Sequence, residues 1–70
     1  MIRVIIAEDL EILRKRLIKS MDSTGDIKVV GESSTGKGII EIAKQTPFDI
    51  AVLDIEMESA EAGLDAAKAI

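Results

Sequence analysis

The chain has 70 residues with 9 basic and 13 acidic side chains, a formal net charge of -4 and a pI of about 4.6. It has neither cysteine nor histidine, which excludes disulfides, thiolate zinc sites, thiol nucleophiles and proton shuttling by its own histidines. No basic run stands out in the sequence, so we expect these residues not to bind nucleic acid themselves.

The length is marginal for a self-sufficient core, because domains usually hold about 100 to 150 residues. We therefore expect a single domain, or part of one, over residues 1–70. The apolar start is too short for a signal peptide, and no apolar run has the length of a membrane span. The default expectation is a soluble cytoplasmic protein without membrane contact.

Residues 2–7 are mostly apolar and predict a strand that ends in Glu8 and Asp9. An amphipathic helix follows, with apolar residues at helical spacing and charged residues on the other side. Asp9 is placed to cap this helix, and Glu11 and Lys15 are placed to form an i,i+4 pair. The apolar positions of the helix are Leu10, Leu13, Leu17, Ile18 and Met21.

The rest of the chain alternates in the same way. Residues 27–31 predict a second strand of β-branched residues, and residues 35–45 a second helix that ends because Pro47 disfavours helical geometry at the residue before it. The apolar run within residues 49–54 suits a strand buried on both faces, although periodicity alone leaves a short buried helix open. An Ala-rich helix over about residues 60–70 completes a βαβαβα order, which predicts a parallel sheet with right-handed crossovers.

Carboxylates follow two of the predicted strands. Glu8 and Asp9 come at the end of the first and Asp54 at the end of the third, where open parallel sheets place their ligand crevice. Like charges brought together raise one another's pKa or hold a cation, and an all-oxygen site suits Mg²⁺ better than a soft metal. The structural alternatives are a helix cap for Asp9, a solvated side chain for Glu8 and a plain loop residue for Asp54.

Four segments carry a resemblance: residues 2–9, 29–32 (Val-Val-Gly-Glu), 47–49 (Pro-Phe-Asp) and 52–57 (Val-Leu-Asp-Ile-Glu-Met). Together they resemble a known family, the receiver domains of bacterial two-component response regulators. The whole chain resembles the first three βα units of such a domain, and Val-Val-Gly-Glu is similar to the subgroup with a LuxR-type helix-turn-helix output domain. The resemblance implies a CheY-like, flavodoxin-like fold: a three-layer α/β protein with a doubly wound parallel sheet in strand order 2-1-3, truncated to βαβαβα.

The resemblance also implies roles for single residues. Asp54 corresponds to the phosphoacceptor, which takes a phosphoryl group from a phosphohistidine on a sensor histidine kinase. Asp9 corresponds to a Mg²⁺ ligand, with Glu8 contributing directly or through water and the backbone carbonyl of Glu56 as a third ligand. The implied protein is a signalling domain rather than an enzyme, with self-catalysed aspartyl phosphorylation at most. Its implied output is transcription regulation through a DNA-binding domain that lies outside these residues.

The family completes this site with a Ser or Thr after a fourth strand and a Lys after a fifth, and the sequence ends before both. We therefore expect slow phosphorylation of this chain by itself. The third strand also has the character of a central strand but no predicted partner beyond it. An exposed apolar sheet edge invites pairing with another chain, so we expect self-association there.

Two other functions stay open. Residues 31–38 match the G-x-x-x-x-G-K pattern of a phosphate-binding P-loop and lie between a strand and a helix, but Gly38 replaces the hydroxyl residue that would contact Mg²⁺. A P-loop-like nucleotide-binding fragment is therefore the first alternative. The second is a non-catalytic interaction module that acts only by pairing its sheet edge with another protomer.

Overall fold

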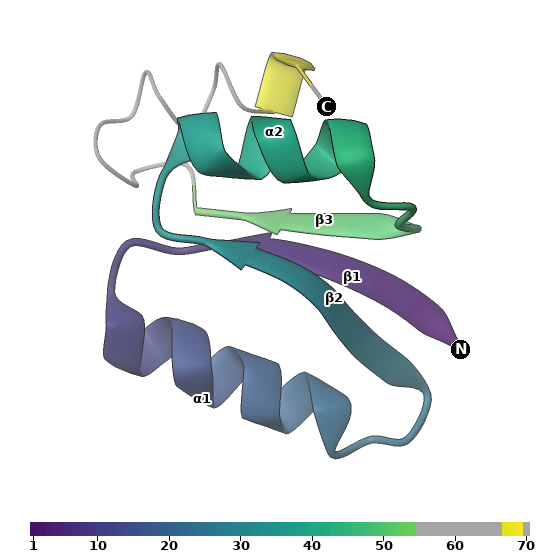
Figure 1. Cartoon of the computed structure of the whole chain (residues 1–70). Coiled ribbons are helices and arrows are strands. Elements are labelled where there is room, and N and C mark those ends of the chain that lie inside the picture. Colours follow the sequence, from purple (N-terminus) through teal and green to yellow (C-terminus); the bar gives the residue numbers. More distant parts are fainter. Residues whose placement is uncertain (55–66, 70) are drawn as a thin grey trace.

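A parallel sheet lies at the centre of the computed structural model, which describes residues 1–54 and 67–69 (Figure 1). Within these residues the strand order is β2-β1-β3, and α1 and α2 cover opposite faces of the sheet. This arrangement confirms the predicted three-layer α/β fold with strand order 2-1-3. The elements are β1 (Ile2–Ala7), α1 (Glu11–Asp22), β2 (Ile27–Ser33), α2 (Gly36–Gln45) and β3 (Ile50–Leu53).

The core is built around β1, whose last four residues are buried. Successive side chains of a strand point to opposite faces, so Ile5 and Ala7 pack together against Ile39 of α2. Complete burial of a side chain such as Ile5 or Ile39 stabilises the fold by about 1.5 to 3 kcal/mol. Partly buried side chains surround this cluster: Val30, Ile40, Ile42, Ala43, Phe48, Ala51 and Leu53.

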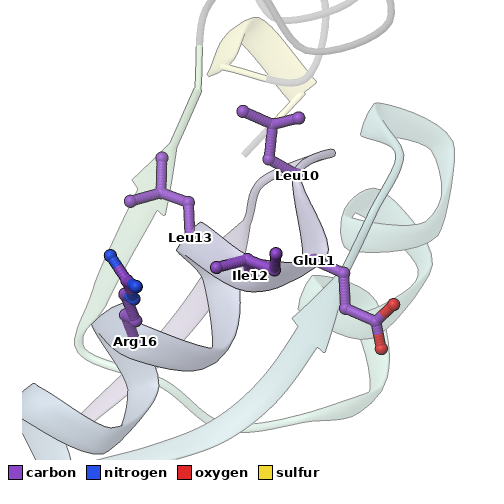
Figure 2. A pocket seen from close by; sticks show the side chains of 5 residues that line it. All are labelled: Leu10, Glu11, Ile12, Leu13 and Arg16. Carbon is purple, nitrogen blue, oxygen red and sulfur yellow. The ribbon is translucent and has the colours of Figure 1, made fainter.

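The other face of the sheet is covered less completely. α1 has no buried residue, and Leu10 and Ile12 at its start are 62% and 73% exposed. Figure 2 shows Leu10 and Leu13 pointing to the same side, away from Glu11, around a surface hollow. The predicted apolar side of this helix therefore exists, but it is only partly covered.

Two predicted contacts at the start of α1 are wrong. The N-cap position is Leu10 instead of Asp9, and no side chain caps the helix there. Lys15 pairs with Glu32 of β2 at 3.2 Å instead of with Glu11. Local spacing reveals neither difference: Lys15 meets a residue of β2, and the Leu10 N–H donates to Glu8 Oε1 at 3.3 Å.

The start of α2 decides against the P-loop alternative. Thr35 is the N-cap and accepts a hydrogen bond from Gly38 N–H at 3.0 Å. Gly31, Glu32 and Ser33 belong to β2, so only a short turn joins the strand to α2. The wide glycine-rich loop that cradles phosphates is therefore not formed by these residues.

Predictions for the carboxyl-terminal part lie mostly outside the described residues. This applies to the loop over residues 55–59, which holds Glu56, and to most of the helix predicted over residues 60–70. Residues 67–69 are described and are helical. Among the described helices, none combines the length and the apolar character that a membrane crossing requires.

Candidate functional site

Three carboxylates meet at the carboxyl edge of the sheet. Glu8 and Asp9 follow β1, and Asp54 follows β3. One carboxylate oxygen of each residue lies within 4.8 Å of the others. The structure thus brings together three of the four site residues proposed from the sequence, and the fourth, Glu56, lies outside the described residues.

Backbone hydrogen bonds at the end of β1 hold this cluster in place. Asp54 N–H donates to the carbonyl of Ala7 at 3.0 Å, and Glu8 N–H donates to the carbonyl of Ser33 at 3.1 Å. In the sheet register, Ala7 lies opposite both Leu53 and Ser33. The last residue of β1 therefore fixes the positions of the carboxylates that follow β1 and β3.

The environments of the three carboxylates differ. Glu8 is only 6% exposed, whereas Asp54 is half-buried and Asp9 is exposed. Burial is the largest cause that raises the pKa of Glu8, followed by its hydrogen bond with Asp54 and by repulsion from Asp54 and Asp9. The N–H of Leu10, 3.3 Å from Glu8 Oε1, opposes this by lowering the pKa. The buried Glu8 carboxyl is thus held beside two further acids, which disfavours its ionised form.

The donor set fits a hard divalent cation. Carboxylate oxygens are the ligands that Mg²⁺ prefers in proteins, and Mg²⁺ usually takes one or two carboxylates and keeps several waters. Asp9 is exposed enough to leave room for those waters. Repulsion around Glu8 is the strain that a bound cation relieves, because a positive charge favours the ionised form of all three acids.

The cluster borders an apolar hollow between α1 and β3. Val52 and Leu53 line the β3 side of this hollow, and Leu13 and Leu17 line the α1 side, with Glu8 and Asp54 at its end. Its apolar walls make the surroundings of the acids less polar than open water, which strengthens charge interactions there.

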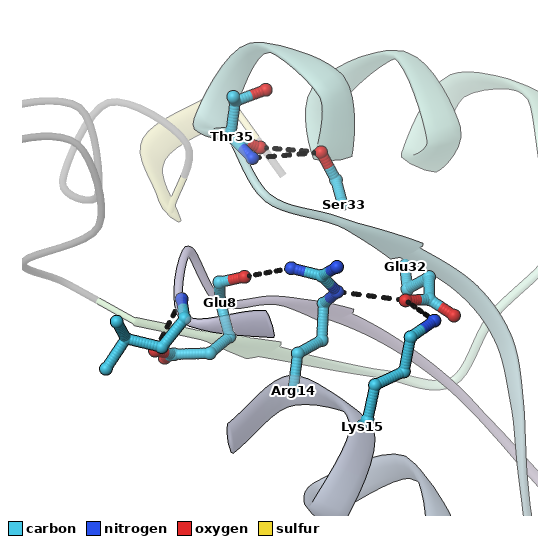
Figure 3. Close-up of polar contacts among 7 residues, drawn as sticks. Glu8, Arg14, Lys15, Glu32, Ser33 and Thr35 are labelled. Carbon is cyan, nitrogen blue, oxygen red and sulfur yellow. Dashed lines mark hydrogen bonds and ion pairs between the residues drawn. The ribbon is translucent and has the colours of Figure 1, made fainter. Parts of the chain in front are cut away.

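Sequence reasoning missed one residue of the site, Arg14. Its Nη1 donates to the Glu8 carbonyl at 2.8 Å and its Nε to Glu32 Oε1 at 2.9 Å (Figure 3). In the sequence, Arg14 is one of several basic residues on the polar side of a helix. No local signal distinguishes it, because both partners depend on how α1 packs beside β1 and β2.

Comparisons with known proteins add independent evidence. No family model matches the chain. The transcriptional regulatory protein LiaR of Bacillus subtilis (strain 168) is 34% identical over 70 residues, which are 100% of this chain and 33% of that protein. The transcriptional regulatory protein DesR of the same organism is 35% identical over 68 residues, 97% of this chain and 34% of that protein.

A third relative has a different name. A protein-glutamate methylesterase/protein-glutamine glutaminase of Idiomarina loihiensis (strain ATCC BAA-735 / DSM 15497 / L2-TR) is 30% identical over 69 residues, 99% of this chain and 18% of that protein. The chain thus spans about a third of the length of the two regulators and less of the third relative. The likeness therefore concerns a segment that proteins of different names share.

The parallel sheet with acidic residues at its carboxyl edge defines an open α/β protein whose site lies at the strand ends. Over nearly its whole length the chain is similar to bacterial transcriptional regulatory proteins. Its strand order is that of a truncated CheY-like fold, which agrees with the resemblance to the receiver domains of bacterial two-component response regulators.

Proposed function

We propose that this chain is the phosphoacceptor part of a response regulator and that Asp54 accepts a phosphoryl group from a phosphohistidine on a sensor histidine kinase. The observation that carries the proposal is the convergence of Asp54 with Glu8 and Asp9 within 4.8 Å. An Asp54 carboxylate oxygen forms the bond to phosphorus while the nitrogen–phosphorus bond of the donor breaks. The freed imidazole keeps the electron pair of that bond.

The exposure of the acidic residues supports different roles for them. Asp54 is half-buried and Asp9 exposed, so a donor can reach the first while the second faces solvent. We assign Glu8, Asp9 and Asp54, with the backbone carbonyl of Glu56, to the binding of Mg²⁺. When bound, this cation neutralises the charge that builds up as phosphoryl oxygens approach the carboxylates.

We assign residues 1–70 to one partial receiver domain that controls transcription from the cytoplasm. The names of LiaR and DesR, both transcriptional regulatory proteins, support this output. The methylesterase relative is named for a catalytic activity, and we propose no such activity for this chain. Its own chemistry is limited to self-catalysed phosphorylation of Asp54.

We also propose that the chain self-associates through β3. This strand lies at one edge of the described sheet, and its Ile50 is 49% exposed. An apolar strand at a sheet edge offers unpaired backbone groups to a second chain. Self-association by itself would also agree with the alternative of a non-catalytic interaction module. The acidic site must therefore be tested separately.

A Mg²⁺ titration followed by NMR tests the site. We expect weak binding with amide shifts confined to residues near 8, 9 and 54, and loss of these shifts in Asp9→Ala and Asp54→Ala. Asp26→Ala is the matched control, because it removes an exposed acid at the other end of the sheet, beside the start of β2. Shifts centred on residues 31–38 would contradict the assignment.

Phosphorylation tests the chemistry itself. With a small phosphodonor such as acetyl phosphate and Mg²⁺, we expect slow incorporation of one acid-labile phosphate, absent in Asp54→Asn and dependent on the cation. Asp26→Asn is the control, because it removes an exposed aspartate away from the site. An acid-stable phosphate on Ser33, Ser34 or Thr35 would count against a carboxylate acceptor.

A further inference from the structure

The side chain of Arg14 links two elements beside the acidic cluster. It is only 12% exposed, and Figure 3 shows its guanidinium between Glu8 and Glu32. Nη1 donates to the Glu8 carbonyl at 2.8 Å, and Nε donates to Glu32 Oε1 at 2.9 Å. Lys15 also contacts Glu32, at 3.2 Å, but its side chain is 57% exposed. Arg14 is thus the inner of the two bases.

These contacts close a ring around the backbone of Glu8. Its N–H donates to the Ser33 carbonyl at 3.1 Å, and its carbonyl accepts from Arg14, which is bound to the neighbour of Ser33, Glu32. The backbone N–H of Glu8 is therefore attached to the end of β2 directly, and its carbonyl is attached there through Arg14. The turn that carries Glu8 and Asp9 begins at a point fixed from two sides.

The positive charge of Arg14 is paired with Glu32, which is not one of the three clustered acids. Hydrogen bonding from Arg14 is the first cause that lowers the pKa of Glu32, so Glu32 stays ionised and holds the guanidinium. Arginine suits this task because its planar fork offers several donors in fixed directions. A partly buried, charge-assisted hydrogen bond is also stronger than a neutral one.

We propose that Arg14 is a positioning residue of the cation site, which holds the Glu8–Asp9 turn in the geometry for binding by tying the Glu8 carbonyl to Glu32. This proposal rests on the proposed function, because it assigns a role toward the cation that Glu8, Asp9 and Asp54 would bind. Arg14 acts through the backbone and is not itself a ligand.

Positioning and plain electrostatics predict opposite results. A cationic side chain near a cation site repels the cation, so charge alone predicts tighter Mg²⁺ binding when Arg14 is neutralised. Positioning predicts weaker binding, because groups that orient metal ligands typically contribute about 10- to 100-fold to affinity. The sign of the change therefore separates the two explanations.

The experiment is a Mg²⁺ titration of the full chain by NMR, with Arg14→Gln, Arg14→Lys and Arg16→Gln. We expect the dissociation constant to rise about tenfold or more in both Arg14 variants, since the single amine of Lys lacks the fork that reaches both partners. Arg16 is exposed on the same helix, so Arg16→Gln removes the same charge and should leave the affinity unchanged or slightly higher. Amide shifts of β1 and β2 report whether each variant is folded.

A double-mutant cycle gives a second test that does not depend on Arg14 variants alone. Glu32→Ala should weaken Mg²⁺ binding, and adding Arg14→Gln should then cost little more, because the two residues act as one unit. Unchanged or tighter binding in folded Arg14 variants, or additive effects in the cycle, would overturn the positioning role while the wild type still binds Mg²⁺. No Mg²⁺ binding by the wild type at residues 8, 9 and 54 would instead refute the proposed function and, with it, this role.

Discussion

Arg3 and Asp49 join the amino-terminal ends of β1 and β3 by side chain and by backbone. Arg3 Nη2 lies 3.2 Å from Asp49 Oδ1, and Arg3 Nε lies 3.3 Å from Oδ2. The N–H of Arg3 donates to the same carboxylate at 2.9 Å, and the N–H of Asp49 donates to the Arg3 carbonyl at 2.8 Å. This pair fixes β3 on β1 at the end of the strands opposite the acidic site.

The Arg3–Asp49 pair predicts an acid-dependent part of the stability. The hydrogen bonds and charge of Arg3 hold the pKa of the Asp49 carboxyl below its ordinary value. A carboxyl whose pKa is lower in the folded state stabilises the fold above its unfolded pKa of about 3.9 and loses that contribution as the pH falls through the folded value. Urea unfolding measured from pH 6 downward should therefore show a loss of stability below about pH 4.

Asp49→Asn isolates this contribution. The variant should be less stable than the wild type near neutral pH, and the difference should disappear in acid, where both side chains are neutral. The pair is exposed, so the effect is reduced by solvent screening and by added salt. Asp26→Asn is the control. An equal difference at all pH values would show that hydrogen-bond geometry, instead of charge, is the cause.

Glu8→Gln should raise the stability of the cation-free protein and weaken cation binding. Burial and repulsion raise the pKa of Glu8 in the folded protein, so the ionised side chain destabilises the fold at pH values above its unfolded pKa. A neutral Gln at neutral pH removes that cost and should raise the free energy of unfolding in the absence of Mg²⁺, by about 0.5 to 2 kcal/mol for a substitution of this kind.

The same variant should respond less to the cation. Wild-type stability should rise on addition of Mg²⁺, because a ligand that binds only the folded state stabilises it, and Glu8→Gln should lose most of this rise. Chemical denaturation with and without Mg²⁺ measures both effects. A variant less stable than the wild type without Mg²⁺ would mean that the Glu8 carboxylate is a structural requirement.

Self-association has two candidate surfaces, which two substitutions distinguish. Ile50 lies on the edge strand β3 and is 49% exposed, and Ile12 lies on α1 and is 73% exposed. Association through the sheet edge predicts that Ile50→Lys shifts sedimentation velocity toward the monomer, because a charged edge residue opposes strand pairing. Ile12→Lys should then have little effect. The reverse pattern would assign association to the α1 surface shown in Figure 2.

Gly31 should tolerate no larger residue. A Cβ built at this position would lie 2.6 Å from Ile42 Cγ2 and 3.4 Å from Ile5 Cγ2, so Gly31→Ala overpacks the contact between β2 and α2. The expected loss of stability is about 1 to 3 kcal/mol, measured by chemical denaturation. In a double variant with Ile42→Ala, the loss should be smaller than the sum of the single losses, because the two side chains then share one space.

The order of elements could be predicted because each signal is local. The apolar run of residues 2–7 matches β1, and the pre-proline position ends α2 near Gln45. The strand order 2-1-3 is implied by the resemblance to receiver domains, since the handedness of crossovers by itself allows other orders. β2 is two residues longer than predicted, since Glu32 and Ser33 pair with Ile6 and Ala7 of β1 despite their polar side chains.

The site could be predicted only in part. The approach of Glu8, Asp9 and Asp54 follows from strand ends in a parallel sheet. The ring through Arg14 could not be predicted, since it joins residues 18 positions apart, Arg14 and Glu32, that only the packed fold brings together. The Lys15–Glu32 pair is likewise a contact between α1 and β2 that sequence spacing does not reveal.

The acidic cluster exists only in one alignment of β3 on β1, in which Ala7 lies opposite Leu53. A slip of two residues keeps the same faces inward but moves Asp54 by about 6.6 Å along the strand. That displacement exceeds the 4.8 Å within which the three carboxylates lie. Cation binding would thus report that β3 is paired with β1 in the native register. Saturating Mg²⁺ would favour this register over shifted ones while the chain folds.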